Sequence, residues 1–210
     1  LAFGERHETL LENYFSMPWN HFLANVSGEM ATVINAPYAN LSTTLLNVTE
    51  RLTIDDLSGT TSNYNAGLSA SNLNPQTDTA FYRSPVPYTF NSLVAENAEF
   101  EVNMCINTAT ISDPIKSNDT LAFYQRFYNY FAPDDGSCEA GYGLTVNSAK
   151  AAYLFKLNTT DTLRSVQMFF NRVVNDVNQI YFYLTIWGDS GSVPGSILYQ
   201  QSGVRPEFEP

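Results

Sequence analysis

Hydrophobic and polar positions alternate most regularly in the last third of the chain. Across Gln179–Trp187, every second residue from Ile180 to Ile186 is aliphatic or Phe, and the residues between them are Tyr or Thr. This two-residue period predicts a β-strand. Further strands are predicted at Ala151–Leu157 and Leu163–Asn171, with polar turn residues between the segments. Several short strands joined by such turns are typical of a β-sandwich or jelly roll.

The preceding residues predict a mixture of elements. His7–Phe15 and Glu50–Leu57 have the pattern of strands, whereas Leu23–Ala36 has apolar residues near helical spacing and stops before Pro37. Phe100–Ile106 predicts another strand with an alternating apolar face. We therefore expect a mixed α/β part followed by an all-β part.

The composition favours a folded, acidic protein exposed to an extracellular medium. Of the 210 residues, 44% are hydrophobic and 14% are aromatic, which is enough to form a packed core. The net charge of −11 repels a phosphate backbone, so nucleic-acid binding is not expected. No apolar run approaches the length of a membrane span, so no transmembrane segment is expected. No signal peptide is visible at Leu1, and an exported chain would already have lost its leader.

One turn carries a concentration of carboxylates. Asp134 and Asp135 lie between Pro133 and Gly136, and Glu139 follows. Hard oxygen ligands of this kind could bind Ca²⁺, although the spacing is not that of an EF-hand. The alternative is an Asp-rich turn whose side chains accept hydrogen bonds from nearby backbone N–H groups. The two adjacent aspartates would diverge, which argues against a pair of glycosidase carboxylates.

The two cysteines, Cys105 and Cys138, are candidates for a disulfide. Their separation closes a loop of about 30 residues, for which a bond would contribute roughly 3–4 kcal/mol. The alternative is two buried free thiols. The sequence has no CxxC pair and no Cys/His cluster, so a zinc site is not expected.

The residues needed for nucleophilic catalysis are not brought together by the sequence. Both histidines, His7 and His21, lie near the start of the chain. The run Gly188–Gly191 (Gly-Asp-Ser-Gly) superficially matches a serine-protease motif, but it follows a strand and has the residues of a hairpin turn. We do not expect an enzyme.

Aromatic side chains are frequent in the second half and offer two interpretations. Exposed rings could form a platform on which sugars stack, whereas buried rings would pack the core of a sandwich. The candidates are Phe123, Tyr124, Phe127, Tyr128, Tyr130, Phe131, Tyr181, Tyr183 and Trp187.

The segment from Ala132 to Phe208 resembles a β-sandwich module of proteins exported by the type IX secretion system. The resemblance covers over a third of the chain. It rests on four stretches, which are Asp134–Leu144, Thr162–Asn171, Leu184–Trp187 and Pro194–Gly203. Such modules usually continue beyond the point where this chain ends, so we expect the jelly-roll-like sandwich to be incomplete at its C-terminus.

The first part resembles the thioredoxin-like domain that often precedes such modules in exported outer-membrane proteins. The matching stretches are His7–Phe15 and Val86–Phe90, and the resemblance implies a cis peptide bond before Pro87. The redox pair of that family should follow Phe15, but Ser16–Phe22 contains no cysteine. Dithiol chemistry needs both thiols, so the expected domain is degenerate and not an oxidoreductase.

Three Asp-Thr-apolar triplets match the O-glycosylation pattern of some exported surface proteins. They place the candidate acceptors at Thr79, Thr120 and Thr162. The alternative is ordinary turn and strand-start chemistry.

These observations predict a chain of three parts. Residues 1–95 form a degenerate thioredoxin-like domain, residues 96–120 a connecting strand and linker, and residues 121–210 a truncated β-sandwich module. We expect a non-catalytic, secreted protein of the bacterial cell surface, associated with the outer membrane, whose structural or adhesive work depends on a protein partner. The alternatives are a calcium-dependent carbohydrate-binding module and a subunit of an outer-membrane complex. No cofactor other than Ca²⁺ is expected.

Overall fold

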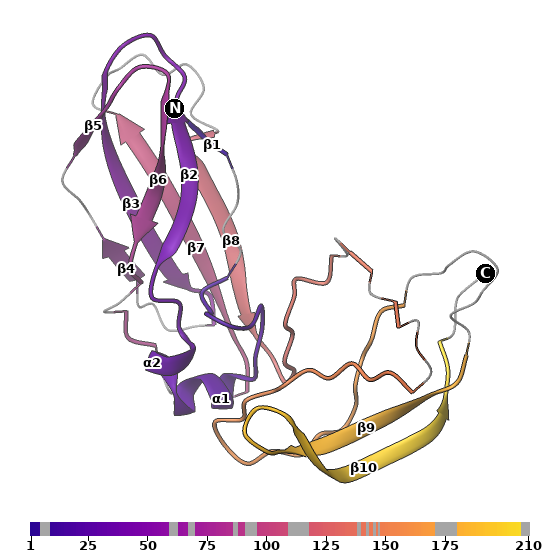
Figure 1. The fold of residues 1–210 in the computed structure, drawn as a ribbon. Coiled ribbons are helices and arrows are strands. Elements are labelled where there is room, and N and C mark those ends of the chain that lie inside the picture. The colour runs from indigo at the N-terminus through magenta and orange to yellow at the C-terminus, as the bar shows by residue number, and fades with distance from the viewer. Residues whose placement is uncertain are drawn as a thin grey trace. The chain divides into compact units, whose positions relative to one another are not determined.

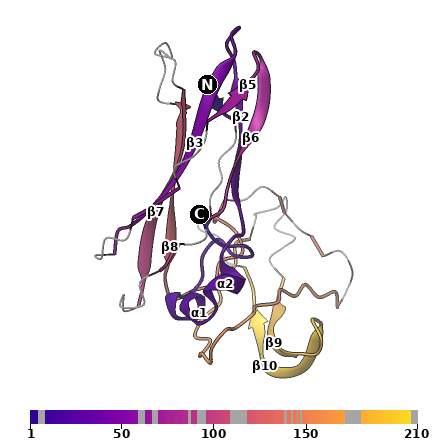
Figure 2. The same cartoon turned by 90° about the vertical axis from the view of Figure 1, so that its left-hand side faces the viewer.

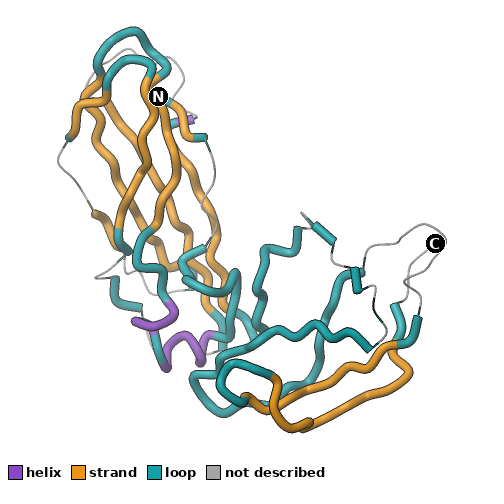
Figure 3. The backbone as a smooth tube through the Cα atoms, viewed as in Figure 1, coloured by secondary structure: helices purple, strands orange, loops and turns teal. Residues whose placement is uncertain are grey.

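The computed structural model describes most of the chain, in two units that are treated separately. The described residues are 1–4, 9–58, 63–66, 70–85, 88–90, 96–108, 118–137, 140–141, 143–144, 146, 148–170 and 180–206. Unit 1 comprises Leu1–Ser137 and unit 2 comprises Cys138–Pro210. Figure 3 shows that strands far exceed helices in the described part of the chain, as the alternating sequence patterns predicted.

Unit 1 contains two antiparallel sheets (Figure 1). The smaller sheet has the order β1-β2-β6, formed by β1 (Ala2–Phe3), β2 (Ile34–Asn40) and β6 (Thr77–Arg83). The larger sheet has the order β4-β3-β7-β8, and β5 also pairs with β3. Its strands are β3 (Leu46–Asp56), β4 (Asn63–Ala66), β5 (Ser71–Leu73), β7 (Ala98–Thr108) and β8 (Thr120–Phe127).

The two sheets pack face to face as a β-sandwich. The view in Figure 2 shows β3, β7 and β8 in one layer and β2 and β6 in the other. Along β7, every second residue from Ala98 to Ile106 is buried and the residues between them are partly exposed. This alternation puts one side of each sheet into a shared hydrophobic core and the other side toward solvent.

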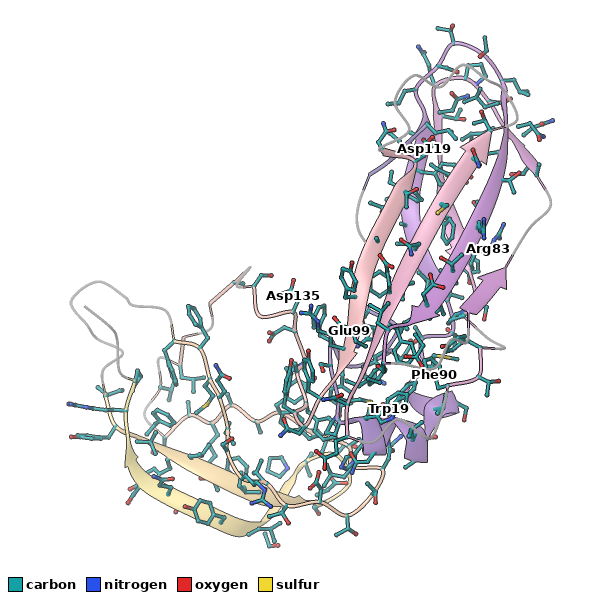
Figure 4. The ribbon with its side chains drawn as sticks, turned by 180° about the vertical axis from the view of Figure 1, so that it is seen from behind. Trp19, Arg83, Phe90, Glu99, Asp119 and Asp135 are labelled. Carbon is teal, nitrogen blue, oxygen red and sulfur yellow. The ribbon has the colours of Figure 1, made fainter. Side chains whose placement is uncertain are left out.

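A cluster of aromatic rings fills one end of the sandwich, next to the two short helices α1 (Trp19–Ala24) and α2 (Val26–Glu29). The Phe22 ring lies 4.5 Å from Phe127 and 4.9 Å from Phe90, between ring centroids. Trp19 lies 5.0 Å from Phe127 and 6.2 Å from Phe90, and Figure 4 shows Trp19 and Phe90 beside the helices. The large apolar area of these rings makes the helices part of the sandwich core.

The side chain of Gln125 fixes an N-terminal segment against β8. Its Oε1 accepts hydrogen bonds from the backbone N–H of Leu10 at 2.7 Å and from Thr9 Oγ1 at 2.9 Å, and its Nε2 donates to the carbonyl of Phe15 at 2.9 Å. Ser16 Oγ donates to the carbonyl of Arg126 at 2.8 Å. The segment from Thr9 to Ser16 therefore lies along the C-terminal end of β8.

Unit 2 contains one described hairpin, formed by β9 (Phe182–Asp189) and β10 (Pro194–Val204). In the turn between the strands, the carboxylate of Asp189 accepts a hydrogen bond from the Ser192 N–H at 2.7 Å. Gly191 and Ser192 both have positive φ, at 70° and 66°. The predicted strand is confirmed from Phe182 onward, but it runs through Gly188 to Asp189, so the turn lies at Ser190–Val193 rather than at Gly188–Gly191.

Two other predicted strands of unit 2 are wrong. The segments Ala151–Leu157 and Leu163–Asn171 were expected to be strands, but residues 148–170 have no strand pairing in the structure. An alternating sequence defines two faces, whereas a strand also needs a neighbour that accepts and donates backbone hydrogen bonds. The described neighbours do not supply one for these segments.

The predicted helix is also corrected. Leu23–Ala36 is helical only as far as Glu29, and β2 begins at Ile34. The two compact units of the structure divide between Ser137 and Cys138, and β7 pairs with β3 along nine residue pairs within unit 1. The predicted division of the chain into three parts stays a prediction. The described part of unit 1 does not show the expected thioredoxin-like arrangement.

Candidate functional site

The predicted calcium turn is, in its described residues, a pair of side-chain-stabilised turns. Asp134 Oδ1 accepts a hydrogen bond from the Gly136 N–H at 2.9 Å. Asp135 Oδ1 accepts bonds from Ser137 N at 2.8 Å and from Ser137 Oγ at 2.5 Å. Both carboxylates are thus engaged in the turn geometry that the alternative interpretation described. Glu139 lies outside the described residues, so the calcium site stays a prediction.

Cys105 lies on the outer side of β7 and is partly exposed. Its Sγ accepts a hydrogen bond from Thr120 Oγ1 at 3.7 Å, within the register in which the two residues are opposite each other. Cys138 lies outside the described residues, so a bond between the two thiols stays a prediction.

The other predicted site residues are exposed or lie outside the description. Thr79 on β6, Thr120 on β8 and Thr162 in unit 2 are all exposed, which is compatible with modification and equally with turn and strand-start chemistry. Pro87 lies outside the described residues, and so does the expected cis bond.

The histidine in the described part of the chain lies in the core of unit 1. His21 is fully buried in α1, where its ring packs edge-on against Phe131 at 5.1 Å between centroids. His7 lies outside the described residues. In the part of the chain that the structure describes, no group of three or more His, Cys, Asp or Glu could hold a metal ion. No helix there is long and apolar enough to cross a membrane.

A charged cluster between the two sheets was missed by the sequence analysis. Glu50 of β3 points into the sandwich, where its Oε1 accepts a hydrogen bond from the Tyr38 hydroxyl at 3.0 Å and its Oε2 forms an ion pair with Arg83 Nη2 at 2.7 Å. Burial, together with the adjacent Glu50 carboxylate, raises the pKa of Tyr38 far above its usual range. Glu50 occupies the same strand face as Val48 and Leu52. Its position in this alternation could have shown from the sequence that the Glu50 side chain is buried.

The outer face of the larger sheet carries a polar group with one exposed ring. Tyr124 is 48% exposed, and the guanidinium of Arg126 lies 6.0 Å from its ring centroid. Arg126 Nε also forms an ion pair with Glu99 at 2.7 Å, and the Tyr124 hydroxyl donates to Glu101 at 3.4 Å. Two other aromatic residues that were candidates for sugar stacking, Phe123 and Phe127, are buried in the core.

Unit 2 carries most of the exposed apolar surface of the described chain. Seventeen of its large hydrophobic residues are exposed, against six in unit 1, and the hydrophobic core cluster lies entirely in unit 1. On the hairpin, Tyr183 is 67% exposed and Tyr199 is 55% exposed. Exposed apolar surface of this extent marks interaction sites in folded proteins. It is therefore the candidate functional site, and we call it the apolar surface of unit 2.

Its most exposed members beyond residue 179 lie on or beside the hairpin. They are Ile180, Tyr181, Tyr183, Val193, Ile197, Leu198 and Tyr199. Tyr181 and Tyr183, which were candidates for sugar stacking, belong to this surface, whereas Trp187 on β9 is only partly exposed.

Comparisons with known proteins assign the chain to no family. No family model, no curated protein and no solved structure matches it.

Proposed function

We propose that the protein is a non-catalytic, secreted cell-surface protein whose work is to bind another protein through the apolar surface of unit 2. The observation that carries the proposal is the contrast between a closed core in unit 1 and exposed apolar residues in unit 2. Burying such residues against a partner removes apolar area from water, which is the main driving force of protein association. The mechanism is interface burial rather than bond chemistry.

The proposed location rests on the resemblance of Ala132–Phe208 to modules exported by the type IX secretion system. By this resemblance the protein would lie outside the cell in association with the outer membrane, and a structural or adhesive role or a place in a membrane complex would follow. Fractionation of the source cells, followed by protease treatment of intact cells, tests this location. Recovery of the protein only from the cytoplasm would contradict it.

Site-specific photo-crosslinking tests the interaction. A photoreactive phenylalanine analogue replaces Tyr183, which is 67% exposed in unit 2, or Tyr82, which is 61% exposed in unit 1. The two positions have the same side chain and similar exposure, so Tyr82 is a matched control. We expect protein crosslinks from position 183 and few from position 82. Equal yields from both positions, or none from position 183, would remove the support for this surface.

Carbohydrate binding is the second candidate, favoured by the exposed ring of Tyr124. A sugar ring could stack on Tyr124 while Glu101 and Arg126 contact its hydroxyl groups. Binding to a glycan array, with and without Ca²⁺, tests this candidate. Loss of binding in Tyr124→Ala, with binding kept in Tyr82→Ala, would support it, and an array without any bound glycan would exclude the glycans displayed there.

A further inference from the structure

The edge of β10 differs from the sheet edges of unit 1. In unit 1, the edge strand β6 carries the charged residues Asp78 and Arg83, and β1 has only two residues. The edge strand β8 carries Arg126, and its C-terminal end is covered by the segment that Gln125 holds. Charge, shortness and cover are three of the devices that keep strand edges from pairing with other chains.

None of these devices protects β10 in the described structure. The strand has 11 residues and contains no charged side chain. Figure 1 shows it as the outer strand of the hairpin, with β9 between it and the remaining described loops of unit 2. Its pairing to β9 is regular from Tyr199 to Gln201, opposite Ile186 to Leu184, with register shifts before and after this stretch, so the pairing edge that we consider is confined to these residues.

A two-stranded hairpin is also too small to be stable by itself. Isolated hairpins are marginal in water, and three or more strands with an apolar face are needed for independent stability. β9 and β10 have exposed apolar side chains on their surfaces, including Ile197 at 57% and Leu198 at 69%. Addition of strands to the β10 edge would extend the sheet and bring these side chains against new neighbours.

We propose that the added strand is β10 of a second copy, so that two chains associate by antiparallel β10–β10 pairing. An antiparallel strand edge is complementary to itself under two-fold symmetry, and the result is a four-stranded sheet with the order β9-β10-β10-β9. This inference rests on the proposed function, because it names the partner that the apolar surface of unit 2 binds.

The distribution of charge favours this occupant. Residues 138–210 contain five basic and six acidic residues, so unit 2 is nearly neutral and unit 1 carries almost all of the net charge of −11. Two β10 strands can approach each other without opposing like charges. The repulsion between the two acidic chains acts over a longer distance and is weakened by salt. Pairing through β10 should therefore become tighter as the salt concentration rises.

Sedimentation equilibrium of the full chain tests the proposal. We expect a concentration-dependent mass that approaches twice the monomer mass of 23.4 kDa, with a lower dissociation constant at about 0.5 M than at about 0.05 M NaCl. Tyr199→Lys places a charge in the pairing edge and is expected to weaken the dimer about tenfold or more. Tyr82→Lys makes the same charge change at a similarly exposed tyrosine of unit 1 and should leave the dimer unchanged.

A second variant separates the effect of the added charge from the effect of losing the Tyr199 ring. Ser202→Glu adds a charge to the same strand without removing an apolar side chain, and it should also weaken the dimer. A wild-type chain that stays monomeric at both salt concentrations overturns the proposal, and so does a dimer that Tyr199→Lys and Ser202→Glu leave intact. If the chain is monomeric but position 183 crosslinks to a different protein, β10 self-pairing fails and the proposed function stands.

Discussion

The two units use similar strand patterns with opposite results. In unit 1, the alternating residues of β3 and β7 face a second sheet, and Leu52, Phe100 and Val102 have no exposed surface. In unit 2, β9 and β10 form a two-stranded sheet with no second sheet in the described structure, and Tyr183 is 67% exposed. An alternating pattern gives a strand one apolar face, but that face is buried only where a second sheet packs against it.

The strongest way to sharpen this comparison is to remove one phenylalanine from each unit. Phe127 is fully buried among the rings of Trp19 and Phe22, so Phe127→Ala should lower the free energy of unfolding by about 3–5 kcal/mol through lost burial and a cavity. Phe169 is 79% exposed, and Phe169→Ala should change it by less than about 0.5 kcal/mol. Urea denaturation followed by circular dichroism measures both. Similar losses in the two variants would contradict the contrast between the units.

The next largest effect on stability is expected from breaking two ion pairs that have the same length but different surroundings. Glu50 and Arg83 lie 2.7 Å apart between the sheets, whereas Glu99 and Arg126 lie 2.7 Å apart on the surface. Glu50→Gln leaves Arg83 partly buried without its counter-charge and should cost about 2 kcal/mol of stability. Glu99→Gln should cost less than about 1 kcal/mol, because water and salt screen the surface pair. Equal costs, measured by urea denaturation, would show that Arg83 is as well solvated as Arg126.

A smaller effect is expected at the N-terminal segment. Gln125→Ala removes the acceptor of the Leu10 N–H and the donor to the Phe15 carbonyl, which should cost about 1–2 kcal/mol. The side chain of the exposed Gln200 donates a hydrogen bond to Thr185 Oγ1 in the hairpin, and Gln200→Ala should change stability by less than about 0.5 kcal/mol. Hydrogen exchange at Leu10 should accelerate in Gln125→Ala alone, and unchanged exchange would mean that other contacts hold the segment.

The smallest effect at neutral pH concerns Tyr38. Tyr38→Phe removes the hydrogen bond to Glu50 and should cost about 1 kcal/mol. Because the pKa of Tyr38 is raised in the folded state, its contribution is complete below the unfolded pKa of about 10 and is lost as the pH rises above it. The wild type should therefore lose more stability between about pH 9 and pH 11 than Tyr38→Phe does. Parallel losses in both chains would contradict the raised pKa.

Three strand predictions were confirmed because alternation of apolar and polar residues can be seen in the sequence alone. Glu50–Leu57, Phe100–Ile106 and Gln179–Trp187 overlap β3, β7 and β9. Strand β2 was missed, because Pro37 and two alanines blur its alternation and because Ile34 also fits the helical spacing of the preceding residues. For Ala151–Leu157 a strand was predicted where the structure has none. Its sequence pattern could not show that no neighbouring strand lies beside it in the described structure.

For the candidate sites too, features that depend on neighbouring residues could be predicted from the sequence, and features that depend on distant residues could not. The competition between a turn and an ion at Asp134 and Asp135 was foreseen, and the hydrogen bonds to Gly136 and Ser137 follow the turn. The cluster around Glu50 was not foreseen, because its partners Tyr38 and Arg83 come from the opposite sheet and only the fold brings them together. The exposure of the hairpin could not be predicted either, because the strand pattern of β9 resembles that of a buried strand.

The placement of the two tryptophans gives each unit its own optical signal. Trp19 is 1% exposed among the rings of unit 1, and Trp187 is partly exposed on β9, opposite Ile197. Emission at short wavelength should therefore follow the melting of the sandwich, and emission at longer wavelength should follow the hairpin. A single heating experiment can thus show whether the two units melt together or one after the other, without any added label.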